Sequence, residues 1–203
     1  MADEARTQPI ADLLLTCRPG KAGNLLQFPY HLENRGPAGI YAMHAWPSID
    51  PASGAARASQ QTVVAILGTE GNVALGHFIP PLPTDRRVAV PVVPLARWLP
   101  PGASLEGELD IPLPLAETSP YFADLTLRQY DIVDIAAIVL TIGYWIAGVD
   151  GLVAAPVDYA PDLSVVVTRD TLRSAQQISQ RLPTKGLQIF KRTDAFPRSP
   201  LGS

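Results

Sequence analysis

The chain has 203 residues, a formal net charge of −3, 21 prolines and one cysteine. This length supports a buried core without disulfides or structural metals. A single cysteine excludes an internal disulfide and any cysteine-based metal or redox motif. The first residues carry no apolar stretch of the signal-peptide type, which favours a cytoplasmic location.

Alternation of apolar and polar residues predicts strands along most of the chain. Within the second strand, Phe28 and Tyr30 share one face with Leu32, which predicts core positions for all three. The segment 48–60 is rich in small residues, and we expect a mobile loop there because it has little to bury. The first three predicted strands span residues 11–17, 25–33 and 40–46.

A hairpin is predicted next, because residues 62–67 and 73–78 flank a four-residue turn that begins and ends with glycine. Residues 88–93 form the following strand, which we place at an edge or a bulge since Pro91 has no amide hydrogen to donate.

The clearest strand is 105–113, where leucine and isoleucine alternate with Glu106, Glu108 and Asp110. This pattern is typical of a sheet with one solvated face. Strand geometry also separates the two glutamates by about 7 Å, so an acid and base pair of the glycosidase kind is a less favoured alternative.

The segment 135–149 holds no charged residue, yet it is shorter than the roughly 20 residues of a membrane-spanning helix. It predicts a central strand over 135–147, buried on both faces. Asp131 and Asp134 precede it and indicate the end of a loop rather than a calcium site. Two further strands, 125–133 and 163–168, complete the predicted set.

Many short strands separated by glycine and proline turns predict an all-β fold, an immunoglobulin-like antiparallel β-sandwich over residues 8–168. The run from Phe28 to Trp46 is similar to the early strands of many immunoglobulin-like sandwiches. That similarity rests on generic turn chemistry and indicates a fold class rather than one family. The prolines at strand ends protect the sheet edges from uncontrolled pairing.

A basic extension follows, because residues 169–203 have a net charge of +5 while the first 168 have −8. Asp170 is placed to cap a helix over about 171–182, followed by a short strand over about 186–191 and a flexible end. The extension either folds onto the acidic body or binds a partner, and the partner-binding candidates are Arg173, Arg181, Lys185, Lys191 and Arg192.

The predicted helix has apolar residues at spacings of three and four, which leaves two hypotheses for its role. It packs on one end of the sandwich, or it docks on another subunit. Nucleic acid is the less favoured partner, because no basic run is interleaved with exposed aromatic residues.

Catalytic and metal-binding motifs are lacking, so we expect no cofactor and no metal. The sequence contains no G-x-S-x-G and no phosphate-binding glycine loop. A copper site built from Met43, His44, His77 and Cys17 is disfavoured, since Met43 and His44 are neighbours and point to opposite faces of a regular strand. A hydrogen-bonded histidine at the margin of the core is the favoured interpretation of His44.

The tryptophans Trp46, Trp98 and Trp145 are expected in core or corner positions rather than in a ligand platform. The favoured function is a non-catalytic protein interaction or assembly module that binds a protein partner or a second copy of itself and does not span a membrane. The alternative is a small-ligand or carbohydrate-binding β-sandwich, and a hydrolase that uses surface carboxylates is favoured least.

Overall fold

A computed structural model describes residues 11–82, 88, 91–122, 130–149 and 151–193. It is built almost entirely of strands, with one short helix, α1 (Thr171–Ser174), and one 3-10 turn, η1 (Thr69–Gly71). The strands within these residues are β1 (Leu13–Cys17), β2 (Gly20–Ala22), β3 (Leu25–Asn34), β4 (Ile40–Ile49), β5 (Ala56–Ser59), β6 (Val64–Leu67), β7 (Asn72–His77), β8 (Leu95–Leu99), β9 (Ser104–Pro112), β10 (Leu115–Ala116), β11 (Tyr130–Asp134), β12 (Ala137–Ile146), β13 (Val153–Val157), β14 (Ala160–Val167), β15 (Gln176–Pro183) and β16 (Gln188–Arg192).

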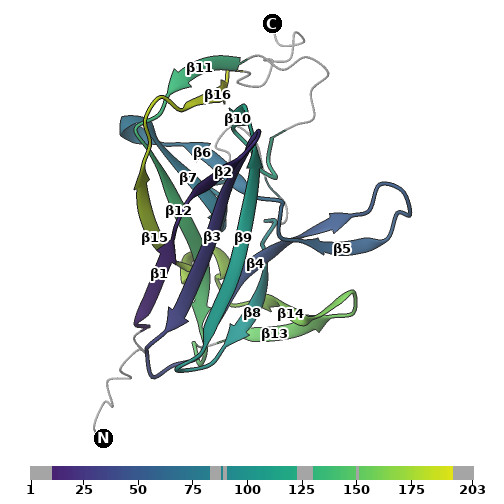
Figure 1. Cartoon of the computed structure of the whole chain (residues 1–203). Coiled ribbons are helices and arrows are strands. Elements are labelled where there is room, and N and C mark those ends of the chain that lie inside the picture. The colour runs from purple at the N-terminus through teal and green to yellow at the C-terminus, as the bar shows by residue number, and fades with distance from the viewer. Residues whose placement is uncertain (1–10, 83–87, 89–90, 123–129, 150, 194–203) are drawn as a thin grey trace, which may run out of the picture.

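Two large sheets pack together, and a small third sheet lies at one end of them (Figure 1). In the smaller of the two, β3 pairs with β1 and β2 along one edge and with β9 along the other. The larger sheet has the order β13-β14-β8-β4-β12-β7-β6, with β15 added to β12 and β5 added to β4. The third sheet has the order β10-β16-β11. The prediction of an all-β sandwich is confirmed, and its immunoglobulin-like character stays a prediction.

The core lies between the two large sheets, and the period-two pattern predicted its residues on β3 and β9. Phe28, Tyr30 and Leu32 are buried, as expected. On β9, Leu105 and its apolar neighbours of the same parity are buried, while the two glutamates are exposed. Alternation therefore placed the correct face of each strand inward.

Strand β12 lies in the middle of the large sheet, as its uncharged sequence predicted. Along one edge it pairs with β15 over its first eight residues. Along the other edge it pairs first with β7, in parallel, and then with β4. Nine of its ten residues are buried, which is typical of a strand covered on both faces.

The predicted helix over 171–182 is wrong beyond its first turn. Asp170 accepts a hydrogen bond from the backbone N–H of Arg173, but α1 ends at Ser174 and the chain continues as β15. Ile178 and Leu182 are spaced by four, which fits a helix turn and equally fits two strand periods. Pairing with the open edge of β12 decides between them, because a buried edge needs partners for its N–H and C=O groups. A helix docked on another subunit is thereby excluded for these residues.

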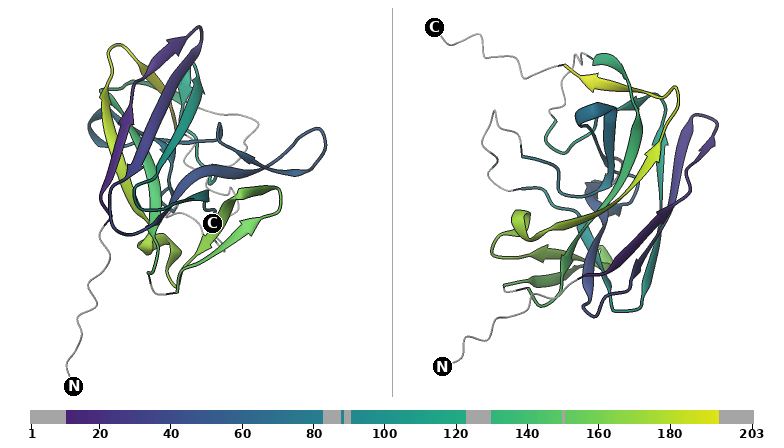
Figure 2. Two further views of the ribbon diagram at one scale, coloured as in Figure 1. Left: turned by 60° about the horizontal axis from the view of Figure 1, so that its bottom comes forward. Right: turned by 90° about the vertical axis from the view of Figure 1, so that its left-hand side faces the viewer.

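The segment predicted as a loop over 48–60 contains a strand. Strand β4 continues through Pro47 to Ile49 and pairs with β5 to form a hairpin that projects from the body (Figures 1 and 2). Its turn is held by Asp50, whose Oδ1 accepts hydrogen bonds from the backbone of Ala52 and Ser53. Small side chains here did not prevent pairing, since the backbone supplies the hydrogen bonds.

Other predicted elements agree with the structure in part. The hairpin of β6 and β7, the strand β14 and the short strand β16 all lie where expected. Asp131 and Asp134 lie on β11 rather than in a loop. Of the predicted strand 88–93, residues 88 and 91–93 are not in a strand, and 89–90 lie outside the described residues, as do residues 125–129, 1–10 and the end from 194.

The segment after residue 168 contributes β15 to the large sheet and β16 to the third sheet. Among the described residues, no helix has the length and apolar character needed to cross a membrane.

Candidate functional site

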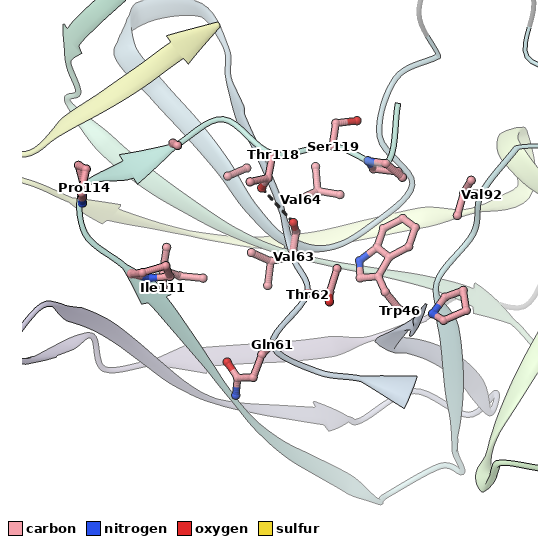
Figure 3. Close-up of a pocket in the computed structure, with 15 residues that line it drawn as sticks. Trp46, Gln61, Thr62, Val63, Val64, Val92, Ile111, Pro114, Thr118 and Ser119 are labelled. Carbon is pink, nitrogen blue, oxygen red and sulfur yellow. Dashed lines mark hydrogen bonds between the residues drawn. The ribbon is translucent and has the colours of Figure 1, made fainter. Parts of the chain in front are cut away.

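A cavity of about 430 Å³ opens beside Trp46, between the far end of β4, the chain leading into β6 and the segment that follows β9 (Figure 3). This volume lies within the range of small-molecule sites. None of the described residues that line the cavity is charged. We call it the Trp46 cavity, and its lining residues are Trp46, Pro47, Gln61, Thr62, Val63, Val64, Ala65, Val92, Ile111, Pro112, Pro114, Ala116, Thr118, Ser119 and Pro120.

The indole N–H of Trp46 is a buried polar group in the wall of this cavity. The residue is 3% exposed, and its Nε1–H has no hydrogen-bond partner among the described residues. Figure 3 shows the nitrogen edge of the ring turned toward the other lining residues rather than into the β4 backbone. A buried donor without a partner costs about 1–3 kcal/mol. A bound acceptor atom in the cavity would remove that cost.

The other polar side chains around the cavity are bonded within the protein. The Thr118 hydroxyl donates to the carbonyl oxygen of Val63 at 3.0 Å, and the Thr62 hydroxyl donates to Ser59 at 2.9 Å. The side-chain oxygen of Gln61 accepts from the Asp110 N–H at 2.9 Å. Among these groups, the Trp46 N–H is thus the buried donor left without a partner in the described residues.

The walls of the cavity are brought together by long-range pairing. Ala65 on β6 and Thr118 form an antiparallel bridge with both N–H to O distances at 2.9 Å, which fixes the segment after β10 against β6. On the opposite wall, the pairing of β4 with β8 shifts register between Met43 and Ala45, leaving His44 as an extra residue. His44 and its neighbours Met43 and Ala45 are all buried, so this part of β4 is covered on both faces.

A pair of buried histidines lies behind the wall formed by residues 60–62. His77 Nε2 lies 3.0 Å from the Gln60 carbonyl oxygen and 3.1 Å from that of Thr62, so Nε2 carries the hydrogen and donates. The Gln60 side-chain nitrogen donates to His44 Nε2 at 2.9 Å, so His44 carries its hydrogen on Nδ1, 3.2 Å from the Tyr30 hydroxyl. The predicted hydrogen-bonded His44 at the core margin is confirmed.

Both histidines are held neutral at ordinary pH. Burial lowers the pKa of His77 to about 4, with a smaller contribution from the charge of His44. Burial also lowers the pKa of His44 to about 4, assisted by the positive charge of Arg97. Their rings are 6.5 Å apart, edge to face, and the described residues contain no group of three histidine, cysteine or acidic side chains placed to hold a metal.

The five basic residues singled out from the sequence do not form one patch. Arg173 lies on α1 and pairs with Asp170, whereas Arg181 is on β15 and Lys191 and Arg192 are on β16. Figure 2 places α1 and β16 toward opposite ends of the molecule. The Arg192 guanidinium lies 4.7 Å from the centre of the Phe122 ring. The proposal that all five bind one partner surface has no support from their placement.

Lys185 lies in the turn between β15 and β16 and lines a second cavity. Glu106 and Glu108 are exposed on the outer face of β9, as a solvated sheet face predicts. Trp145 is buried, whereas Trp98 is 45% exposed and packs beside Tyr41, with ring centres 4.9 Å apart.

Sequence reasoning placed Trp46 in the core but did not predict the cavity. The available signal was the group of prolines at 112, 114 and 120, because proline has no N–H to donate to a neighbouring strand and presents the apolar carbons of its ring. Comparison of the chain with known protein families, with curated proteins and with solved structures found no match.

Proposed function

We propose that the chain is a binding module whose Trp46 cavity takes a small neutral organic molecule carrying one hydrogen-bond acceptor. The observation that carries this proposal is the buried Nε1–H of Trp46, which has no partner among the described residues, in a cavity of about 430 Å³. Apolar walls with a single oriented polar group are typical of small-ligand sites. The uncharged lining selects against ionic ligands, since an unpaired buried charge is costly.

The test is a titration with 4-tert-butylcyclohexanone and with the matched hydrocarbon tert-butylcyclohexane, followed by ¹⁵N–¹H spectra of the indole groups. We expect the ketone to bind more tightly and to shift the Nε1–H signal of Trp46, while the signals of Trp98 and Trp145 stay in place. Trp46→Phe removes the donor and keeps an aromatic ring, so it should abolish the preference for the ketone.

Trp98→Phe is the matched control, because Trp98 lies outside the described lining of the cavity. It should bind the ketone as the unmodified chain does. Equal binding of ketone and hydrocarbon, or a ketone effect that is the same in both variants, would overturn the proposal.

A second function, self-association, is favoured by the outer hairpin of the large sheet. Val153 and Val167 lie directly opposite each other on β13 and β14 and are 63% and 53% exposed. Among the described strands, β13 pairs with β14 alone, so its other edge is open. An open edge beside exposed valines is typical of a surface that pairs with a second copy.

Light scattering behind a sizing column tests the second function. We expect a mass above that of one chain, which falls to one chain in the double variant Val153→Lys, Val167→Glu. A mass of one chain for the unmodified protein at high concentration would refute it.

A further inference from the structure

β2 and the turn between β15 and β16 lie at the same end of the sandwich (Figure 1). Residues of both line a second cavity, of about 310 Å³. Both large sheets contribute to its walls. We call it the end pocket, and its lining residues are Pro19, Gly20, Lys21, Leu26, Phe28, Leu113, Ile138, Leu182, Pro183, Thr184, Lys185, Gly186 and Leu187.

The interior of the end pocket is apolar and its rim is cationic. Phe28, Ile138 and Leu182 are buried side chains that reach it from β3, β12 and β15. Lys21 on β2 and Lys185 in the turn between β15 and β16 also line the pocket, and because both are exposed we call them its rim. The arrangement therefore separates an apolar interior from two positive charges.

No acidic residue is found among the described residues that line this pocket. Neither lysine forms an ion pair with another described residue. The Thr184 hydroxyl is already used, because it donates to the carbonyl oxygen of Ile135 at 3.1 Å. The two ammonium groups are the charged groups available to a ligand at the rim.

We propose that the end pocket binds an anionic amphiphile, a molecule with an unbranched apolar chain and a carboxylate or similar single-charged head. The chain lies among Phe28, Ile138 and Leu182, and the head lies between Lys21 and Lys185. Apolar contact supplies affinity, and the lysines select the sign of the head group. The long lysine side chains place their apolar stems along the rim while their charges stay in water.

This site is separate from the Trp46 cavity, and it requires a ligand of different chemistry. Leu113 lines the end pocket, whereas its neighbours Pro112 and Pro114 line the Trp46 cavity. The segment after β9 thus forms a partition between the two cavities. Binding at one can be measured while the other is disabled.

The experiment is calorimetric titration of the full chain with sodium octanoate, 1-octanol, octyltrimethylammonium and sodium acetate. We expect octanoate to bind most tightly, the alcohol more weakly, and the other two not to bind. Added salt should weaken the binding of octanoate but not that of octanol, because salt screens the attraction between the lysines and the carboxylate. Equal affinity for octanoate and octanol in the Trp46→Phe variant, whose other cavity lacks the donor for a neutral ligand, would overturn the proposal.

The double variant Lys21→Gln, Lys185→Gln removes both rim charges at exposed positions and should lower octanoate affinity about five- to tenfold. The matched control is Arg181→Gln, Lys191→Gln, which removes two exposed charges outside the described lining of the pocket. The control should change affinity less than twofold. An equal loss in both double variants would refute a specific role for the rim.

Leu187→Trp tests the apolar interior, since a larger side chain on the half-buried wall fills part of the pocket while both lysines are kept. It should abolish octanoate binding, and unchanged binding would place the ligand elsewhere. Trp46→Phe should bind octanoate normally, which separates failure of this proposal from failure of the first.

Discussion

The imidazole of His77 holds the backbone of Thr62 by a hydrogen bond of 3.1 Å from Nε2 to the carbonyl oxygen. Thr62 lines the Trp46 cavity, whereas His77 is fully buried on β7. The same nitrogen also donates to the Gln60 carbonyl oxygen. One neutral histidine thereby ties the wall of the candidate site to the centre of the sheet.

This relationship predicts that the protein loses stability as the pH falls from about 6.5 toward 4. The folded pKa values of His44 and His77 are both lowered to about 4, so the unfolded chain binds more protons across that window. Each neutral histidine contributes up to about 3 kcal/mol to the free energy of unfolding. This contribution is fully lost below about pH 4. Urea unfolding at pH 7, 5.5 and 4.5 measures the slope of the free energy of unfolding against pH.

His77→Gln should flatten this pH dependence, at the cost of lower stability at pH 7. His31→Gln is the control, because His31 is half-exposed on the outer face of β3. It should leave the slope as it is in the unmodified chain. A slope that is unaffected by the change at His77 would contradict the argument.

Gly76 cannot be replaced without damage to the contact between β7 and β12. Its φ is +145°, a conformation that favours glycine, and an added Cβ would collide with the carbonyl oxygen of Thr141. We expect Gly76→Ala to lower the free energy of unfolding by about 3 kcal/mol or more. Gly20→Ala is the control, since a Cβ there meets open space, and it should change stability by less than about 0.5 kcal/mol.

Thermal and urea unfolding of the two glycine variants measure these differences. A change at Gly76 as small as that at Gly20 would mean that β7 and β12 do not approach each other in parallel as described.

The sequence alone was sufficient to predict the buried face of a strand that faces water on one side and the core on the other. In β3 and β9 the alternation alone identified Phe28 and Leu105 as core residues, because burial has the same period as the pleat. The uncharged run of β12 was also sufficient, since both of its faces are covered.

Sequence reasoning failed where the decisive partner is distant along the chain. The four-residue spacing from Ile178 to Leu182 places both side chains on one face in a helix and in a strand alike. The open edge of β12, which needs a pairing partner, decides in favour of the strand. The Trp46 cavity depends on the bridge between Ala65 and Thr118, which lie 53 residues apart in the printed numbering. No local pattern reports such a bridge, so neither the cavity nor its free indole N–H could be derived from periodicity.

A final prediction concerns the strand that replaced the expected helix. The hydroxyl oxygens of Thr141 on β12 and Ser179 on β15 lie 3.0 Å apart and form a hydrogen bond. Thr141→Val and Ser179→Ala should each destabilise the protein, and the double variant should cost less than their sum by about 0.5–1.5 kcal/mol. Ser179 and Thr141 are direct partners in the register of the two strands, so this coupling requires β15 to lie beside β12.

Ser174→Ala with Thr141→Val is the control cycle, because Ser174 bonds to Thr168 instead, and it should show strict additivity. Additivity in both cycles would mean that residues 176–183 do not form the strand that completes the edge of β12.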